Sequence, residues 1–481
     1  MFSPTVILPG VLKELMTKPR KPRPDVNRKA PRPAPKTPSP STFPPGARAA
    51  RPNSAGVVPI SPHPQAPANA APGARISRRA ADRLRSGHLW VYASDIEAID
   101  VDETDPQALL PVADNRGLLL GTALYSPASQ IALRIVSRDA IAEPEWLQLL
   151  ATRLRTAIAR RKPLLTAETN ACRLVFSEAD DLPGLVADKY GELVILQLLA
   201  RGLDSASVRA ACISVFREEL EPAAILERPD PRVRELEGLS APGMAPLWAR
   251  DTEQPQTGTS FRLNGLEFLY DANAGQKTGA FLDQRTNYAA ASEWAARLGA
   301  TERALDVFCY QGGFALHLAR NCRQVTGVDA SRASLEVAEQ NLAANQPRLS
   351  ANVDWVEGDA FQILRDWSDV LGRGGGQQYD TIVLDPPAFA KSKRAVEGAL
   401  RGYKELNLRG LKMVRAGGLL VTCSCSHHVG WSDLEGAVAS AAADAHRRVR
   451  LLERRGAAPD HPVILNLPET EYLKCLVLEV E

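Results

Sequence analysis

Apolar residues follow an alternating strand and helix rhythm from about residue 256 to the end of the chain. Between segments with helical spacing stand short apolar runs: RALDVF (303–308), QVTGVD (324–329), VDWVEGD (353–359), YDTIVLD (379–385) and GGLLVTCS (417–424). Near-continuous apolar runs are typical of parallel strands covered on both faces. Residues 256–481 are therefore predicted to form a doubly wound α/β domain. The last two runs, at 449–454 and 471–480, have no helix between them, which predicts an antiparallel hairpin at one edge of the sheet.

Two further patterns precede this domain. Residues 75–142 contain short β-rich runs broken by Gly, Asp and Pro, which predict a small all-β domain. A helix that starts near Pro144 opens a mixed region, 143–255, with three strands in 173–199 and a helix over 207–220. Near the end of the chain, a capping box of Ser432 and Glu435 predicts the start of another helix.

Composition separates a fourth segment from the rest. Residues 1–74 hold 11 Lys and Arg, two acids and 18 of the 36 prolines, although the whole chain has a net charge of only +2. Such a segment cannot bury a core, so it is predicted to be a disordered, basic, Pro-rich arm. It is either a loose electrostatic contact for RNA or another polyanion, or a solvated tail without a specific role.

Several classes of protein are excluded at this stage. No run of about 18 apolar residues exists, so no membrane span is expected. The seven cysteines are odd in number and widely spaced, apart from Cys423 and Cys425. This is neither a disulfide framework nor a zinc pattern, and it favours reduced thiols in a cytoplasmic protein without a metal site.

Acidic residues stand at the ends of the first three strands of the α/β domain. Asp306 precedes Gly312 and Gly313, Asp329 ends the second strand, and Asp359 follows the third. Ligands of doubly wound sheets bind outside these strand ends, where an acid can accept hydrogen bonds from a ribose. A nicotinamide cofactor is disfavoured because GxGxxG is absent, so the pattern favours S-adenosylmethionine. The alternative is that each acid only ends a strand or caps a helix.

The fourth and fifth strand ends carry candidate chemistry. Asp385-Pro386-Pro387 forms a rigid loop that could hold a flat base by its edge, and Lys391, Lys393 and Arg394 after it either contact phosphates or lie in solvent. A thiolate beside a methyl donor can attack C6 of a pyrimidine and make C5 nucleophilic. Cys425 is the preferred nucleophile, and Cys423, within the strand, is expected to be a core residue. Residues 275–285 are interpreted as a ligand-lining loop.

Four motifs together resemble one known family. GQKTGAFLDQR, DVFCYQGGF, VLDPPAFAKSK and TCSCSHHV, in that order, are similar to motifs of the bacterial 23S rRNA cytosine-5 methyltransferases that carry an N-terminal PUA domain. The resemblance covers residues 75–481. It implies three domains: a PUA domain (75–142), a central α+β substrate domain (143–255) and a Rossmann-like methyltransferase domain (256–481). Ala280, Leu89 and the arm of residues 1–74 depart from the family pattern.

The resemblance also implies roles for individual residues. Asp385 holds the cytosine edge and Cys425 is the nucleophile. The candidate residues for binding S-adenosylmethionine are Lys277, Gly279, Asp306, Phe308, Gly312, Gly313, Asp329, Asp359 and Asp385. The expected partner is ribosomal RNA of the large subunit or its precursor, without a membrane or a metal, and a homodimer is one oligomeric state considered. Two alternatives remain: N-methylation of guanine or an exocyclic amine through the Asp385 loop, and a non-catalytic RNA-binding protein.

Overall fold

The computed structural model describes residues 73–101, 108–273, 280–390 and 392–481. Nearly all of the arm predicted for residues 1–74, and the candidates Lys277, Gly279 and Lys391, lie outside these ranges. Among the described residues, no helix is long and apolar enough to cross a membrane.

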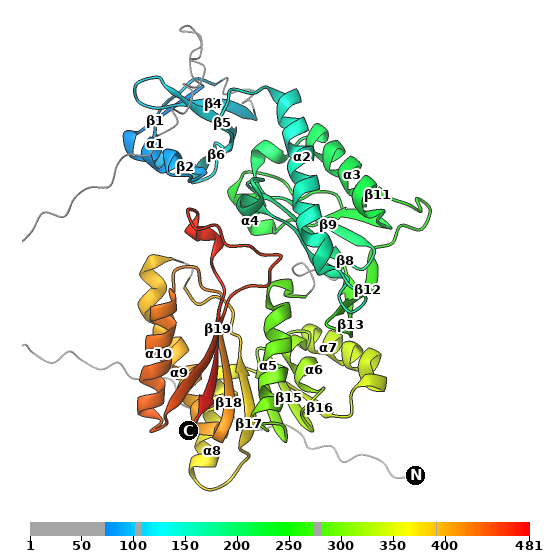
Figure 1. Ribbon diagram of the computed structural model, residues 1–481, viewed down its shortest axis with the longest axis vertical. Coiled ribbons are helices and arrows are strands. Elements are labelled where there is room, and N and C mark those ends of the chain that lie inside the picture. Colours follow the sequence, from blue (N-terminus) through cyan, green and yellow to red (C-terminus); the bar gives the residue numbers. More distant parts are fainter. Residues whose placement is uncertain (1–72, 102–107, 274–279, 391) are drawn as a thin grey trace, which may run out of the picture. The chain divides into compact units, whose positions relative to one another are not determined.

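The first sheet has six strands, in the order β2-β6-β5-β4-β1-β3 (Figure 1). The strands are β1 (Ala74–Ile76), β2 (Trp90–Tyr92), β3 (Ile96–Ile99), β4 (Leu109–Ala113), β5 (Leu119–Tyr125) and β6 (Ile131–Ser137). Helix α1 (Arg78–Arg85) begins at Ser77, whose side chain accepts from the Ala80 amide, and it buries Ala80, Ala81 and Leu84. The β-rich character was predicted, whereas β1, α1 and β4 were not.

The second sheet has five strands, in the order β11-β10-β9-β8-β7. The strands are β7 (Ala171–Phe176), β8 (Leu185–Tyr190), β9 (Leu193–Leu198), β10 (Ala224–Glu227) and β11 (Trp248–Ala249), and the helices are α2 (Glu143–Arg161), α3 (Ala206–Leu220) and α4 (Pro231–Leu236). Apolar residues of α2 and α3, among them Trp146 and Phe216, form one buried cluster with the strands. The predicted helices and the three predicted strands are confirmed here. A two-stranded hairpin follows, β12 (Gly258–Leu263) with β13 (Leu266–Asp271).

The third sheet has seven strands, in the order β16-β15-β14-β17-β18-β20-β19. The strands are β14 (Arg303–Val307), β15 (Gln324–Asp329), β16 (Asn352–Glu357), β17 (Tyr379–Leu384), β18 (Val414–Ser424), β19 (Val449–Arg455) and β20 (Lys474–Val480). Strands β14 to β18 are parallel, and β20 is antiparallel to both β18 and β19. The doubly wound fold and the antiparallel pair are confirmed. Of this antiparallel pair, β19 lies at an edge of the sheet and β20 does not, because β20 lies between β18 and β19.

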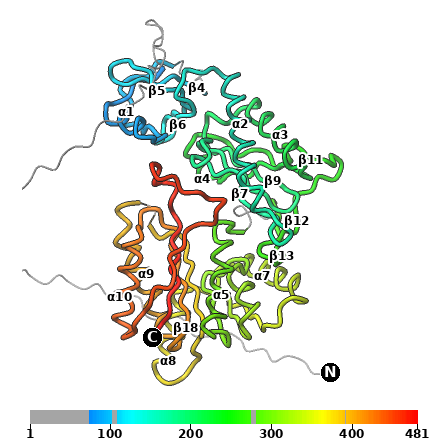
Figure 2. The backbone as a smooth tube through the Cα atoms, viewed as in Figure 1, coloured from blue at the N-terminus to red at the C-terminus, as the bar shows by residue number. Residues whose placement is uncertain are grey.

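Helices cover both faces of this sheet, as Figure 1 and Figure 2 show. Helices α5 (Arg285–Arg297), α6 (Gly313–Leu318) and α7 (Arg332–Asn345) lie on one face, and α8 (Ala360–Gly372), α9 (Val396–Met413) and α10 (Trp431–Asp444) lie on the other. Each set of helices shares a buried apolar cluster with the strands. Central strand residues such as Leu305 and Val383 have no exposed surface because both faces are covered.

The predicted start of α10 is wrong by two residues, because the N-cap is Gly430 and not Ser432. The helix begins at Trp431, so Ser432 lies inside its first turn rather than before it. The carboxylate of Asp433, not that of Glu435, accepts from the Gly430 backbone N–H, at 2.9 Å. An acid in the first turn satisfies an N–H group that has no partner within the helix, and Asp433 was the acid within reach.

Candidate active site

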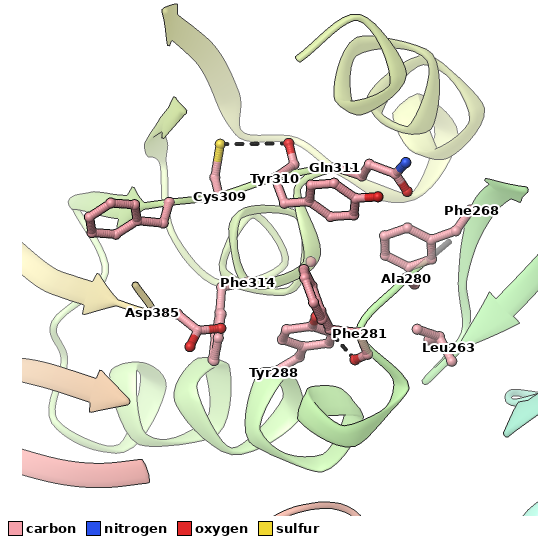
Figure 3. Close-up of a pocket in the computed structure, with 12 residues that line it drawn as sticks. Leu263, Phe268, Ala280, Phe281, Tyr288, Cys309, Tyr310, Gln311, Phe314 and Asp385 are labelled. Carbon is pink, nitrogen blue, oxygen red and sulfur yellow. Dashed lines mark hydrogen bonds between the residues drawn. The ribbon is translucent and has the colours of Figure 1, made fainter. Parts of the chain in front are cut away.

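A pocket lies at the carboxyl ends of β14 and β17, where the strand order of the third sheet reverses. This is the position at which ligands of doubly wound sheets bind. The pocket is a small cavity of about 20 Å³, and aromatic rings form much of its wall. Asp385 lies at one end and Leu263 and Phe268, from the β12–β13 hairpin, lie at the other (Figure 3). Phe308, Gly313 and Asp385 of the predicted site residues line it.

The loop after β14 has an unusual backbone. Phe308 and Tyr310 have φ angles of 67° and 50°, and Gly312 has 86°. Non-glycine residues adopt this left-handed region at a cost and are often found at functional sites. The N–H groups of Phe308 and Cys309 both donate to the Val328 carbonyl, at 2.8 and 3.0 Å, which holds the loop against β15.

Gly312 and Gly313 are needed in this loop for a reason that the sequence did not reveal. They were expected to let the backbone approach a ligand. A Cβ atom on Gly313 would lie 2.5 Å from the Tyr288 ring, and one on Gly312 would lie 2.9 Å from the Trp355 ring. Both glycines therefore allow the backbone to pack against aromatic side chains of the protein itself.

Asp306 lies in the interior of β14 and does not line the pocket among its described residues. It is 1% exposed, and its Oδ2 accepts from the Ala315 backbone N–H at 2.8 Å. No hydrogen-bond partner of its Oδ1 is found among the described residues. Burial raises the pKa of this carboxyl well above its ordinary value. The geometry makes Asp306 a support for the start of α6, and direct contact with a methyl donor stays a prediction.

Asp329 and Asp359 are more accessible than Asp306. Asp329 is half-buried, and its two oxygens accept from the backbone N–H groups of Tyr310 and Ser331, at 2.9 and 2.8 Å. Asp359 is exposed and caps α8 by accepting from the Gln362 N–H at 2.9 Å. A carboxylate offers about four acceptor positions, so both residues keep capacity for a ligand beyond these backbone bonds.

Asp385 follows β17 and is half-buried. Its Oδ2 accepts from Nε2 of Gln284, at 2.9 Å. Burial, reinforced by the negative charge of Asp283, raises the pKa of Asp385 to about 7, and the hydrogen bond from Gln284 lowers it only partly. A carboxyl group in this range can hold or release a proton at neutral pH.

The two cysteines of β18 have different environments. Cys423 is fully buried and is paired in register with Cys475 of β20, and burial raises the pKa of its thiol well above the ordinary value. Cys425 follows the end of β18 and is half-buried. Its Sγ donates to the Pro386 carbonyl oxygen at 3.8 Å, so it touches the loop that holds Asp385. Cys309, expected to be a packing residue, is buried but also lines the pocket.

Ser426 joins the Asp385 loop to the end of β18. Its hydroxyl oxygen accepts from the N–H groups of Phe389 and Ala390, at 3.0 and 3.2 Å, and lies 2.9 Å from the hydroxyl of Tyr403 on α9. Its carbonyl oxygen accepts from Nζ of Lys474, at 2.9 Å. The loop and the strand end are thus held to each other by buried groups.

Sequence reasoning missed two residues beside this centre. Gln284 stands in the segment interpreted as a ligand loop, but only Lys277 and Gly279 were taken from that segment. Lys474 was assigned to a strand, although a lysine that is only 3% exposed is rare. Its Nζ donates to Ser426 and Tyr472 carbonyls, and the negative charge of a Cys425 thiolate would raise its pKa against the lowering effect of burial. No spacing rule identified either residue, since both reach the site only through the fold.

The residues around these strand ends suit the chemistry of S-adenosylmethionine. The aromatic rings of the pocket wall can pack against a flat adenine. Asp329, which does not line the pocket, keeps acceptor capacity for ribose hydroxyls. Backbone hydrogen bonds hold the loop that carries Phe308. Among the described residues, no group of three or more His, Cys, Asp or Glu side chains could hold a metal ion.

Comparisons with known proteins agree with this geometry. Residues 74–138 match a PUA-like domain, and residues 239–474 match an S-adenosylmethionine-dependent methyltransferase. The ribosomal RNA large subunit methyltransferase I of Salmonella arizonae is 35% identical over 389 residues, which are 80% of this chain and 92% of that protein. The same enzyme of Photobacterium profundum is 34% identical over 81% of this chain and 95% of its own length. The chain belongs to the ribosomal RNA large subunit methyltransferase I family.

Solved structures support the fold assignment. A methyltransferase crystallised with S-adenosylhomocysteine has a TM-score of 0.69, with 20% identity over 84% of this chain and 99% of its own. A protein of Streptococcus mutans described as a SAM-dependent methyltransferase has a TM-score of 0.68, with the same identity and coverage. As a member of the methyltransferase I family, the chain is an enzyme that uses S-adenosylmethionine as its methyl donor.

Proposed function

We propose that this enzyme methylates C5 of a cytosine in 23S rRNA through a covalent bond to Cys425. Its relatives are named for ribosomal RNA of the large subunit, which supports the substrate class. The single observation that favours carbon methylation is the contact of the Cys425 thiol with the carbonyl of Pro386, next to Asp385 in the donor pocket. The proposed nucleophile, Cys425, therefore contacts the loop that carries the proposed acid, Asp385, next to the pocket proposed for the methyl donor.

In the proposed reaction, Sγ of Cys425 bonds to C6 of cytosine, and C5 becomes enamine-like. S-adenosylmethionine, when bound, supplies the methyl group that C5 accepts. The proton on C5 then leaves to solvent beside Asp385, the C5–C6 double bond re-forms, and the bond between Sγ and C6 breaks to return the thiolate. Asp329, Asp359, Phe308 and Gly313 are the described residues that we assign to the donor site, with Asp306 and Gly312 supporting its loop.

We assign Asp385 to the edge of the base. In its neutral form it donates a proton to N3 of cytosine, which draws electrons from the ring and makes C6 easier to attack. Because burial raises the pKa of Asp385 to about 7, this neutral form is populated near neutral pH. When the thiolate leaves, the proton returns from N3 to the carboxylate, so the residue ends the cycle as it began.

The remaining regions are assigned to RNA binding. We propose domain boundaries at 75–142 for the PUA-like domain, 143–255 for the central domain and 256–481 for the methyltransferase domain, in a cytoplasmic enzyme. Helix α1 presents exposed Arg78 and Arg79, and cations of this kind bind phosphates without regard to sequence. All seven cysteines lie in the described residues and none forms a disulfide there, in keeping with a reducing compartment.

A fluorinated substrate tests the covalent step. Fluorine at C5 cannot leave as a proton, so 23S rRNA that contains 5-fluorocytosine should trap the enzyme as a band that survives denaturation. Cys425→Ala should abolish both the band and methylation of ordinary RNA. Full methylation by Cys425→Ala would exclude the thiol route and favour nitrogen methylation through Asp385. A dead Cys423→Ala beside an active Cys425→Ala would reverse the assignment of the two cysteines.

A further inference from the structure

Gln284 is a buried side chain whose amide contacts Asp385. It is 3% exposed, and its Nε2 lies 2.9 Å from Oδ2 of the carboxylate. An amide side chain can present either its NH₂ group or its oxygen, and the surrounding hydrogen bonds decide which. The residues that orient the amide of Gln284 lie farther from the pocket.

The hydrogen bonds that orient Gln284 begin at Arg455, at the end of β19. A guanidinium has donors only, so Asn287 must turn its Oδ1 toward Nε of Arg455, at 2.9 Å. The Nδ2 of Asn287 then donates to Oε1 of Gln284, at 2.6 Å, and to the Gly456 carbonyl, at 3.1 Å. Gln284 is left with its N–H group directed at Asp385. Asn287 is 1% exposed, so water does not compete for these bonds.

We propose that Arg455, Asn287 and Gln284 are positioning residues that keep an N–H donor on Oδ2 of Asp385, so that Oδ1 is the oxygen presented to the target base. The proposal deepens the function proposed above and rests on Asp385 contacting that base. None of the three needs to touch the substrate, because their effect passes through the orientation and the protonation of one carboxyl group.

The charges around Asp385 make its pKa sensitive to the hydrogen bond from Gln284. The titratable groups that face it belong to five elements: Asp283 in η5 (Leu282–Gln284), Tyr288 in α5, Asp306 in β14, Tyr403 in α9 and Cys423 in β18. Burial and Asp283 favour the neutral carboxyl, and Gln284 is the hydrogen bond that favours the charged one. Loss of the donor therefore raises the pKa of Asp385, and a second carboxylate in its place raises it further.

Gln284→Glu and Gln284→Met test this inference through the pH dependence of single-turnover methyl transfer. If neutral Asp385 is the active form, activity falls as pH rises through its pKa. We expect Gln284→Glu to move that fall to higher pH by roughly one unit or more, with a smaller shift for Gln284→Met and unchanged affinity for S-adenosylmethionine. The matched control is Gln324→Glu, an exposed glutamine at the amino end of β15, which should keep the wild-type profile. A wild-type profile in Gln284→Glu would overturn the proposal.

The hydrogen bonds from Arg455 through Asn287 to Gln284 are called the relay below. Substitutions of Arg455 test this relay without changing a residue that contacts Asp385. Arg455→Met removes the donor to Oδ1 of Asn287 and leaves only the Gly456 carbonyl to orient this amide. Its profile should therefore shift in the same direction as that of Gln284→Met, by a smaller amount. Arg455→Lys keeps a donor and should restore the wild-type profile, which a purely structural role would not require. A shift with no fluorocytosine band would leave the relay in place and overturn the cysteine chemistry, whereas a band with no shift would overturn the relay alone.

Discussion

The two halves of the site hold their carboxylates in different ways. At the ends of β15 and β16, Asp329 and Asp359 are accessible and bind backbone N–H groups. At the end of β17, Asp385 contacts a buried side-chain donor, lies near Asp283, and has a pKa raised to about 7. In the proposed reaction, the first half fixes the shape of the donor site, and the second adjusts the protonation of the carboxyl group that contacts the base. Substitutions in the two halves should therefore change different measurements.

The largest effect is expected from Asp385→Asn. An amide cannot donate the proton of a neutral carboxyl, so single-turnover methylation should fall by about 10²–10⁴-fold, with little change in donor affinity, and the fall of the rate near pH 7 should disappear. The comparison fails if calorimetry shows that the variant loses binding of S-adenosylmethionine instead.

The same substitution should also change stability. A carboxyl whose pKa rises from 3.8 to about 7 on folding makes the folded state less stable as pH rises through that interval. Asp385→Asn should therefore unfold at a higher temperature than the wild type at pH 8, by a few degrees, and the difference should shrink at pH 4. An equal difference in unfolding temperature at pH 8 and pH 4 would show that folding does not raise the pKa of Asp385.

Asp329→Ala should act on binding alone. A ribose hydroxyl that loses a charged acceptor costs roughly 1.5–3 kcal/mol, so the affinity for S-adenosylmethionine should fall at least about tenfold. Calorimetry measures this directly. An unchanged dissociation constant would remove Asp329 from the donor site, and a shift of the pH profile would contradict the division between the halves.

Lys474→Met should lower the reactivity of Cys425. The positive charge of Lys474 interacts with the negative charge of a Cys425 thiolate, so its removal should slow alkylation of the thiol at neutral pH by up to about tenfold. The measurement is the rate of iodoacetamide labelling of the Cys425 peptide against pH, by mass spectrometry. Lys412→Met, at an exposed position on α9, is the control. Equal rates in both variants would remove Lys474 from the environment of the thiol.

Cys423→Ala should have the smallest effect on the chemistry. Truncation of a fully buried side chain costs about 1 kcal/mol or somewhat more of unfolding free energy, and Cys212→Ala, in the central domain, is a matched control for stability. Denaturant unfolding should give similar losses for both variants, and methylation should persist in both.

The sequence predicted the regular parts of this molecule better than the contacts between them. Strand β15 was placed at its observed bounds, because an apolar run that ends in Asp is a local pattern. The short elements β1 and α1 were missed because three residues and eight residues are too few to give a repeated apolar pattern. The position of β20 inside the sheet was also missed, because strand order depends on pairing between distant segments.

The same limit applies to the site. Asp329, Asp385 and Cys425 could be proposed from the sequence because strand ends converge in this fold, and their roles stay predictions. The relay from Arg455 to Gln284 spans residues about 170 positions apart in the chain, so no local pattern encodes it. Asp306 was assigned to the ligand from its position alone; the structure adds a contact with the Ala315 N–H that the sequence did not indicate, and binding of the methyl donor stays a prediction.

The contacts of Ser426 have a consequence for the RNA. Its hydroxyl and carbonyl join the Asp385 loop, α9, β18 and β20 through buried hydrogen bonds, so the half-buried Asp385 and Cys425 have little freedom to move outward. In the proposed reaction, a cytosine stacked inside a duplex therefore cannot reach them, and the nucleotide must rotate out of its helix or belong to an unpaired segment. Leaving the stack costs a few kcal/mol, and least where pairing is already absent. The rigidity of the protein thereby becomes a selection among RNA conformations, in which the local folding of the ribosomal RNA decides which cytosines are accessible.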